Sequence, residues 1–173
     1  MKRLETKRLV LREIRETDAE GIFAYYSDRE TCYLDGGYEP VKNMDEAFFD
    51  TVKKLAQDEK RYAVALRDSD RMVGTVHVMK AEGRVGKAKE LGYVIAPGYR
   101  RKGYAYEALS AVIRSLFEED LADMILLSAY TENLPSIRLI EKLGFTKEGI
   151  LHRSFYYPPV GICDLASYYL ERG

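Results

Sequence analysis

Residues 91–109 read LGYVIAPGYRRKGYAYEAL, an apolar run that leads through a basic, glycine-containing turn into a helix-like run. A helix start leaves backbone N–H groups without partners and carries a partial positive charge, so phosphate can bind there. Arg100, Arg101 and Lys102 add full charges at this point, and Gly103 has no Cβ, so a ligand can approach the backbone closely. The stretch predicts a strand, an anion-binding turn and a helix in succession.

The glycine spacing distinguishes this turn from two other phosphate-binding motifs. Neither G-x-G-x-x-G nor G-x-x-x-x-G-K-[ST] is present, whereas R-x-x-G-x-A runs from Arg100 to Ala105. This spacing, after a strand that ends in Ala-Pro, resembles the pyrophosphate loop of the GNAT family of N-acetyltransferases, whose usual pattern is Q/R-x-x-G-x-G/A. From these residues alone, a solvated basic turn before an ordinary helix remains the alternative.

The composition limits the class of protein. A chain of 173 residues, 46% of them hydrophobic, is long enough for one domain with a full core, and we expect that domain to span residues 1–173. A net charge of −1 argues against a general nucleic-acid or membrane-surface binder. The only cysteines, Cys32 and Cys163, lack zinc-type spacing and make no disulfide framework. With no signal-peptide pattern and no long apolar run, we expect a cytoplasmic protein.

The first half of the chain predicts strands and helices by its periodicity. Alternation over Arg8–Arg15 is typical of an exposed or edge strand. Thr17-Asp-Ala-Glu20 matches a capping box, which predicts a helix to about Ser27. Residues 28–42 lose the pattern and are expected to form a loop that binds an acceptor, and a second helix is expected over residues 43–57.

The second half completes an alternating order. Its expected strands are residues 61–67, 71–79, 89–96, 124–130, 145–157 and 163–170. Two helices are expected, one after Gly103 and one that begins at Asn133 and stops at Gly144. One face of the first of these helices is apolar, through Ala105, Leu109, Val112, Ile113, Leu116 and Phe117. The order predicts an α/β (α+β) fold with a mixed, mostly antiparallel sheet of about seven strands and helices on both faces.

This order is similar to that of a whole GNAT domain, and further segments resemble one of its subgroups. They are residues 4–18, the segment Glu90-Leu-Gly-Tyr-Val94, the pair Asn133-x-x-Ser136 and the segment Glu141-Lys-Leu-Gly-Phe145. The subgroup contains the bacterial ribosomal-protein N-terminal acetyltransferases. The resemblance implies acetyl-CoA as co-substrate and central strands that splay apart to admit it.

The resemblance also implies which residues hold the coenzyme. Tyr93, Val94 and Ile95 would bind pantetheine and the thioester through their backbone, although as residues they also suit a plain core strand. The pyrophosphate would lie on Arg100, Arg101, Lys102, Gly103, Tyr104 and Ala105, mainly on their amides. Asn133 would meet the coenzyme near the pantetheine, and it is equally suited to cap a helix with Pro135 in the first turn.

The acid and base depart from the family's usual residues. The position of the common tyrosine acid is Ile140, and the glutamate that some relatives place five residues before Asn133 is Ser128 here. Glu90 is the best remaining base, with an exposed strand-end glutamate opposite a lysine as the alternative. Ser136 could protonate the departing thiolate, or it could be an ordinary first-turn serine.

The expected reaction is direct acetyl transfer to an amine without a metal. His77 and His152 have no second ligand at metal spacing, and neither cysteine has an adjacent histidine. The favoured acceptor is a protein N-terminal α-amine, whose pKa of roughly 8 needs less help from a base than a lysine amine at roughly 10.4. A small amine such as an antibiotic or polyamine is the alternative, and so is a non-catalytic acetyl-CoA-binding module. We expect a monomer or homodimer that binds neither nucleic acid nor membrane.

Overall fold

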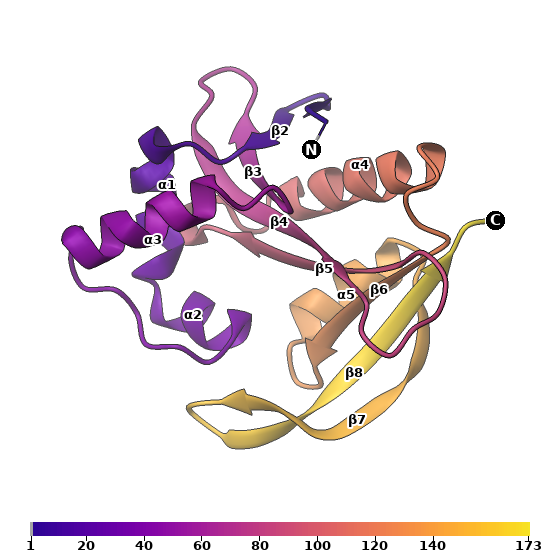
Figure 1. The fold of residues 1–173 in the computed structure, drawn as a ribbon. Coiled ribbons are helices and arrows are strands. Elements are labelled where there is room, and N and C mark those ends of the chain that lie inside the picture. The colour runs from indigo at the N-terminus through magenta and orange to yellow at the C-terminus, as the bar shows by residue number, and fades with distance from the viewer. Residues whose placement is uncertain (1) are drawn as a thin grey trace. The chain divides into compact units, whose positions relative to one another are not determined.

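The computed structural model describes residues 2–173 and contains an open, mixed sheet with the strand order β1-β2-β3-β4-β5-β6-β8-β7 (Figure 1). The strands are β1 (Leu4–Glu5), β2 (Leu9–Glu13), β3 (Arg61–Leu66), β4 (Met72–Lys80), β5 (Ala88–Ile95), β6 (Met124–Tyr130), β7 (Thr146–Tyr157) and β8 (Gly161–Glu171). The helices are α1 (Ala19–Tyr26), α2 (Arg29–Asp35), α3 (Glu46–Ala56), α4 (Tyr104–Glu118) and α5 (Leu134–Lys142). The predicted fold class is confirmed, and the short strand β1 is the addition to the expected sheet.

The chain forms two compact units. The first runs to His77 and takes in Tyr93–Val112, and the second consists of Val78–Gly92 and Ile113–Gly173. Strand β5 therefore contributes its first part to the second unit and its last part to the first. The single domain expected over residues 1–173 stays a prediction, and each unit is described by itself.

The core of the first unit lies between helices α1 and α3 and the strands. Ile22 of α1 and Phe48 of α3 belong to one buried cluster with Ala63, Met72 and Val94 of the strands. Helix α3 starts at this place because the Asp45 carboxylate accepts a hydrogen bond from the Phe48 amide at 3.0 Å, which caps the helix. This packing fixes the end of β5 from which the basic turn departs.

Strand β2 is buried, and the prediction of an exposed or edge strand over residues 8–15 was wrong. β2 pairs with β1 on one side and with β3 on the other, and its Leu9, Leu11 and Arg12 are all buried. Arg12 is tolerated inside because its guanidinium makes two hydrogen bonds, of 2.8 and 2.9 Å, to the buried carboxylate of Asp18. The sequence suggested an exposed strand because Arg12 is polar, but Arg12 belongs to a buried ion pair.

Two expectations for the helices after β2 are also corrected. The capping box predicted at Thr17 and Glu20 is absent: a 3-10 turn covers residues 16–18, and Asp18 accepts from the Arg15 amide at 2.8 Å. The segment 28–42, expected to be a loop, contains helix α2, which Asp28 caps by accepting from the Thr31 amide. Asp28 and Gly36, two of the residues that suggested a loop, thus lie at the start and the end of a short helix.

The β3–β4 hairpin is confirmed. Its two strands pair antiparallel from Arg61 and His77 to Ala65 and Met72, and Asp70 closes the turn with a positive φ of 54°. The amide of Leu66 donates to the carbonyl of Arg71 at 2.9 Å, so the turn is held at its base.

The second unit is organised around β6. This strand pairs with β8 along its whole length, from Met124 to Tyr130, but its parallel pairing with β5 covers only Ala88, Lys89 and Glu90. Helix α5 follows β6 and is capped by Asn133. The long strand β7 pairs with β8 and carries exposed apolar side chains.

Across residues 2–173, none of the helices combines the length and the apolar character needed to cross a bilayer.

The close approach of β4 to the last part of β5 gives a stability prediction. A Cβ at Gly74 would lie 2.2 Å from the carbonyl oxygen of Val94, so Gly74→Ala must displace β5 or β4. We expect the free energy of unfolding to fall by about 1–3 kcal/mol, the usual effect of overpacking, as measured by urea denaturation. Gly98→Ala is the control, because a Cβ there meets nothing within 4 Å. Equal effects of the two substitutions would contradict this packing.

Candidate active site

The turn between β5 and α4 contains two residues with a left-handed backbone conformation. Arg101 has φ 60° and Gly103 has φ 83°, both in the left-handed region that glycine adopts freely and arginine only with strain. The first internal hydrogen bond of α4 runs from the Glu107 amide to the Gly103 carbonyl, so the amides of Tyr104 and Ala105 precede the helix ladder. Such turns create concave surfaces of amide groups that suit an anion. Pyrophosphate binding by these amides stays a prediction.

The Arg100 side chain leaves the turn and contacts α2. Its Nη1 donates to Glu30 Oε2 at 2.7 Å, its Nη2 to Asp28 Oδ2 at 3.3 Å and its Nε to the carbonyl of Ile95 at 3.2 Å. A further hydrogen bond joins Nη2 to Thr31 Oγ1. The guanidinium is occupied by protein groups.

A second brace holds the other end of the turn. Arg8 donates from Nη1 to the carbonyl of Lys102 at 2.9 Å and from Nε to Glu107 at 2.7 Å, while Thr6 donates to the same carboxylate at 2.6 Å. These partners lower the pKa of Glu107 against the opposing effect of burial. A carboxylate in the first turn of α4 is thus neutralised locally, and the basic character of the turn is retained.

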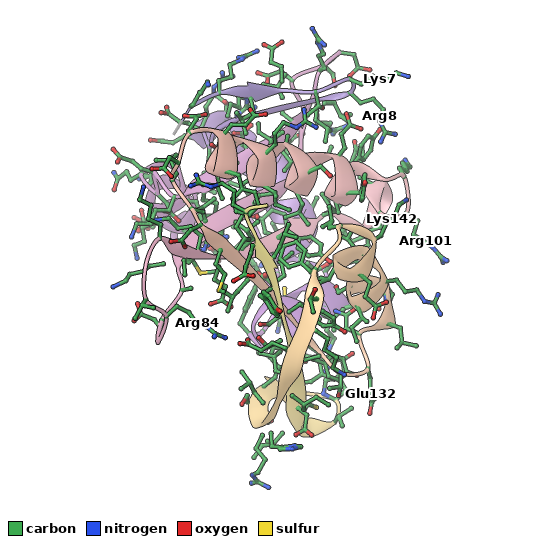
Figure 2. All side chains as sticks on the ribbon, turned by 90° about the vertical axis from the view of Figure 1, so that its right-hand side faces the viewer. Lys7, Arg8, Arg84, Arg101, Glu132 and Lys142 are labelled. Atoms are coloured by element: carbon green, nitrogen blue, oxygen red, sulfur yellow. The ribbon has the colours of Figure 1, made fainter. Side chains whose placement is uncertain are left out.

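The two remaining cations of the turn, Arg101 and Lys102, differ in the contacts of their side chains. Arg101 is exposed and its side chain extends outward from the ribbon in Figure 2. Lys102 Nζ donates to the carbonyl of Gly98 at 2.9 Å and lies 5.2 Å from the centre of the Tyr99 ring. Both positive charges are therefore at the surface beside the amides of the turn.

The last residues of β5 bury their side chains as a core strand does. Val94 and Ile95 are 6% and 8% exposed, and Val94 packs in the core cluster of the first unit. Tyr93 beside them is half-buried. A ligand of Val94 and Ile95 would have to bind their backbone, as the family resemblance implied.

Glu90 lies on the part of β5 that belongs to the second unit. It is opposite Leu126, the last residue pair that joins β5 to β6, so the alternative of a glutamate opposite a lysine does not hold in the β5–β6 register. Burial raises the pKa of Glu90. A carboxylate of raised pKa is a better proton acceptor than an ordinary exposed glutamate.

Asn133 and Ser136 meet at the start of α5. Asn133 Oδ1 accepts from the Ser136 amide at 3.3 Å, so the capping role predicted as the alternative is present. The amide nitrogen of the Asn133 side chain is a separate donor, which leaves a ligand-binding role compatible with the cap. On the same helix Ile140 is 0% exposed, so the position of the family's tyrosine acid is filled by a core side chain.

The two histidines and Cys32, which the sequence analysis considered as metal ligands or nucleophile, have structural partners. Asp164 accepts from the Arg153 amide at 2.9 Å and lies 2.8 Å from His152 Nδ1, which holds the irregular part of the β7–β8 hairpin. His77 lies 3.0 Å from an Arg61 nitrogen, and burial with that cation lowers its pKa. Burial raises the pKa of Cys32 to about 11, so this thiol is protonated near neutral pH and is no nucleophile.

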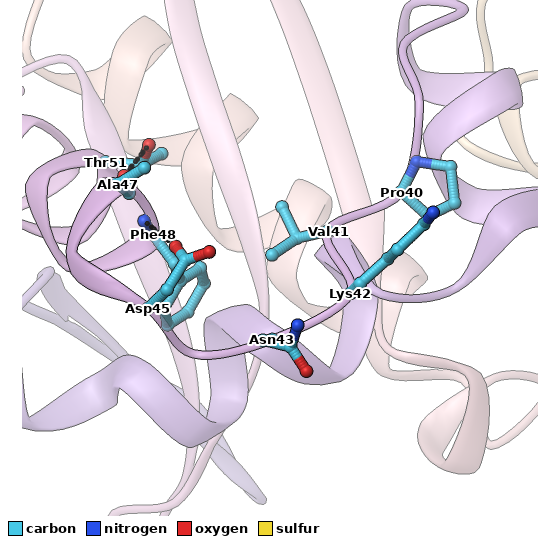
Figure 3. A pocket seen from close by; sticks show the side chains of 8 residues that line it. All are labelled: Pro40, Val41, Lys42, Asn43, Asp45, Ala47, Phe48 and Thr51. Carbon is cyan, nitrogen blue, oxygen red and sulfur yellow. Dashed lines mark hydrogen bonds between the residues drawn. The ribbon is translucent and has the colours of Figure 1, made fainter.

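A surface hollow of about 430 Å³ lies at the start of α3. It is formed by Pro40, Val41, Lys42, Asn43, Asp45, Ala47, Phe48 and Thr51, with the Val41 side chain directed toward Phe48 (Figure 3). None of the predicted coenzyme or catalytic residues contributes to it. Within the described part of the chain, no cluster of three or more His, Cys, Asp or Glu side chains could bind a metal ion.

The structure thus gathers the predicted residues in two groups. The first unit joins residues 93–95 and 100–105 through one continuous strand, turn and helix start, and the second unit contains Glu90, Asn133 and Ser136. Sequence reasoning missed the partners of Arg100 in α2 and those of Glu107 in the first residues of the chain. No local spacing pointed to them, because each pair is separated by many residues.

Comparison with known proteins shows the family of this chain. The model of the acetyltransferase (GNAT) domain matches residues 8–146. YoaA of Bacillus subtilis strain 168, an N-acetyltransferase by name, is 36% identical over 160 residues, which is 88% of each chain. The [ribosomal protein uS5]-alanine N-acetyltransferase of Escherichia coli strain K12 is 27% identical over 156 residues, covering 85% of this chain and 79% of that protein.

A solved structure shows the same fold. The spermidine N-acetyltransferase from Vibrio cholerae, solved with CoA and spermine, superposes with a TM-score of 0.77 at 24% identity and covers 96% of both chains. The subgroup resemblance of the sequence is confirmed by the ribosomal-protein acetyltransferase among the relatives. Because the domain model spans most of the chain and includes the R-x-x-G-x-A turn, the chain belongs to the GNAT family of N-acetyltransferases, enzymes that use acetyl-CoA.

Proposed function

We propose that this N-acetyltransferase acetylates the α-amine of a protein N-terminus, by direct attack of the amine on the thioester of acetyl-CoA. The observation that carries the choice of acceptor is Glu90, a carboxyl on β5 whose pKa is raised by burial, because Ser128 occupies the position of the glutamate base found in some relatives. An α-amine with a pKa of roughly 8 is partly neutral at pH 7 and needs only such modest help.

The proposed reaction requires one proton acceptor and one proton donor. The amine nitrogen forms a bond to the thioester carbon, the carbon–sulfur bond breaks, and the coenzyme leaves as a thiolate. Glu90 takes the proton lost by the amine, and Ser136 gives a proton to the sulfur and is reprotonated from solvent. A backbone N–H near Val94 would stabilise the oxyanion that forms on the carbonyl oxygen.

The proposed donor site follows the groups described above. The amides of residues 101–105 would bind the pyrophosphate, with Arg101 and Lys102 supplying charge from the surface. The backbone of residues 93–95 would hold the pantetheine arm, and this is supported by the burial of the Val94 and Ile95 side chains in the core. Asn133 would contact the arm through its side-chain amide nitrogen.

The proposed acceptor groups lie at the end of α1 and on the segment after it. The Tyr38 hydroxyl donates to Asp35 Oδ2 at 2.9 Å, and the ring of Tyr26 lies 5.5 Å from that of Tyr38. Asp35 reaches solvent, yet the protein around it raises its pKa by desolvation. An ammonium group would find both a carboxylate and aromatic faces here, which supports a cationic amine as acceptor.

The uS5-alanine N-acetyltransferase among the relatives supports a protein N-terminus as that amine. A small polyamine is the second candidate acceptor. The carboxylate of Asp35 beside tyrosine rings favours it, because such a group suits any exposed ammonium.

Acceptor choice can be measured directly. Acetyl-CoA at a hundredfold over its Kd should raise the free energy of unfolding by about 2.7 kcal/mol, which a thermal-shift series detects. Thiol release should then be faster with peptides that have a free N-terminal alanine than with spermidine or with an N-terminally blocked peptide that contains lysine. Turnover of spermidine alone would replace the proposed acceptor by a polyamine, and no thermal shift would contradict coenzyme binding.

The role of Glu90 predicts two pH dependences. Glu90→Gln should lower kcat/KM by about a hundredfold at pH 6.5, and the difference should shrink toward the amine pKa of roughly 8. Stability should also depend on pH, because the pKa of Glu90 is higher in the folded protein than its ordinary value of 4.5, which we take for the unfolded chain. The charged carboxylate therefore destabilises the folded wild type. As pH rises above the unfolded-state pKa, the free energy of unfolding of Glu90→Gln should increase relative to that of the wild type, and the difference should become constant above the folded-state pKa.

Glu118→Gln, which removes an exposed glutamate on α4, is the matched control for both measurements. Parallel pH–rate profiles for wild type and Glu90→Gln would remove Glu90 from the reaction. Parallel stability curves would show that its carboxyl is not desolvated.

A further inference from the structure

We propose that Arg100 is a positioning residue, whose guanidinium fastens the pyrophosphate turn to the start of α2 and does not itself bind phosphate. The inference deepens the proposed function and rests on its claim that the amides of this turn bind acetyl-CoA. It separates the backbone of Arg100, which the family motif places in the turn, from the side chain, which the structure places elsewhere.

All three nitrogens of the Arg100 guanidinium donate hydrogen bonds. Nη1 is bound to Glu30, Nη2 to Asp28 and Thr31, and Nε to the carbonyl of Ile95 at the end of β5. Arg100 is only 31% exposed on its side chain. A planar group held at every nitrogen by acceptors from two elements acts as a fastener, because it can turn toward a ligand only by giving up these hydrogen bonds.

The acceptors on α2 are themselves placed by the helix start. Asp28 Oδ2 accepts from the Thr31 amide at 2.8 Å while it accepts from Arg100, so the helix cap and the fastener share one carboxylate. Burial raises the pKa of Asp28, but the hydrogen bonds from Thr31 and the charge of Arg100 outweigh it and the net pKa is lowered. The carboxylate is therefore charged at neutral pH and available to Arg100.

The turn needs such support because its backbone is strained. Arg101 follows Arg100 directly and has a left-handed φ of 60°, a conformation that disfavours a residue with a Cβ. With the Arg100 side chain bound to α2, and Arg8 bound to the Lys102 carbonyl, both flanks of Arg101 are fixed. The strained amides then face an incoming anion without rearranging.

The sign of one substitution tests this. Glu30→Gln removes a carboxylate that is 65% exposed, and by simple electrostatics it should favour an anion nearby. If Arg100 is a fastener, the Kd for acetyl-CoA measured by calorimetry should instead rise, by about twofold to fivefold, the range expected of a partly exposed ion pair. A Kd that falls, or stays the same, would overturn the inference, because releasing Arg100 would then aid phosphate binding or be irrelevant to it.

A double-mutant cycle gives a second readout. Arg100→Ala and the double variant with Glu30→Gln should have the same Kd, since the second change acts only through the first. Additive effects would show that the two side chains act independently. Arg101→Ala, the exposed neighbour, should weaken binding additively with Glu30→Gln and more strongly at low salt.

The matched control is Glu46→Gln, which removes the exposed first-turn glutamate of α3 and should leave the Kd unchanged. A purely structural role of Glu30 would change the unfolding midpoint and leave the Kd of the folded protein unaltered, which would also overturn the inference. Absence of acetyl-CoA binding by the wild-type protein would overturn the proposed function itself, and is read separately from these variants.

Discussion

The left-handed backbone at Arg101 and Gly103 is the constraint on which the proposed donor site depends. It brings the chain from the buried end of β5 to the first residues of α4 and leaves a group of amides outside the helix ladder. Glycine meets this requirement without strain, whereas Arg101 costs on the order of 1–2 kcal/mol in that conformation. The hydrogen bonds of Arg100 to α2 and of Arg8 to the turn and to Glu107 offset that strain.

The three basic residues of the turn have different proposed roles. Arg100 stabilises the position of the turn, while Arg101 and Lys102 stay at the surface and supply charge. Charge and shape are then controlled by different side chains, although the three residues are consecutive in the sequence. The same division applies to β5, where Val94 packs in the core and its backbone carries the proposed function.

The sequence could predict those parts that depend on local spacing. The R-x-x-G-x-A turn, the Asn133 cap with Pro135 behind it and the β3–β4 hairpin are each encoded within a few residues, and all three are present. The parts that failed depend on distant partners. Arg12 suggested an exposed strand because Asp18 and Asp70, which neutralise it inside the fold, follow no periodic pattern. Helix α2 escaped prediction for the same reason, since its start is stabilised partly by Arg100, far along the chain.

The chemistry proposed for this enzyme depends on what fills the usual positions of acid and base. Ile140 contributes to the core of the second unit, so the phenol used by many relatives is replaced by packing. Glu90, with its pKa raised by burial, is the group that remains on β5. An acceptor that is already partly neutral near pH 7 suits the proposed reaction better than a lysine side chain would.

A crystal structure of the protein with acetyl-CoA bound tests the central claim most directly. The account predicts pyrophosphate oxygens within hydrogen-bond distance of the amides of residues 101–105, with the Arg100 guanidinium still bound to Asp28 and Glu30. A guanidinium turned onto the pyrophosphate, or a coenzyme bound away from this turn, would contradict it.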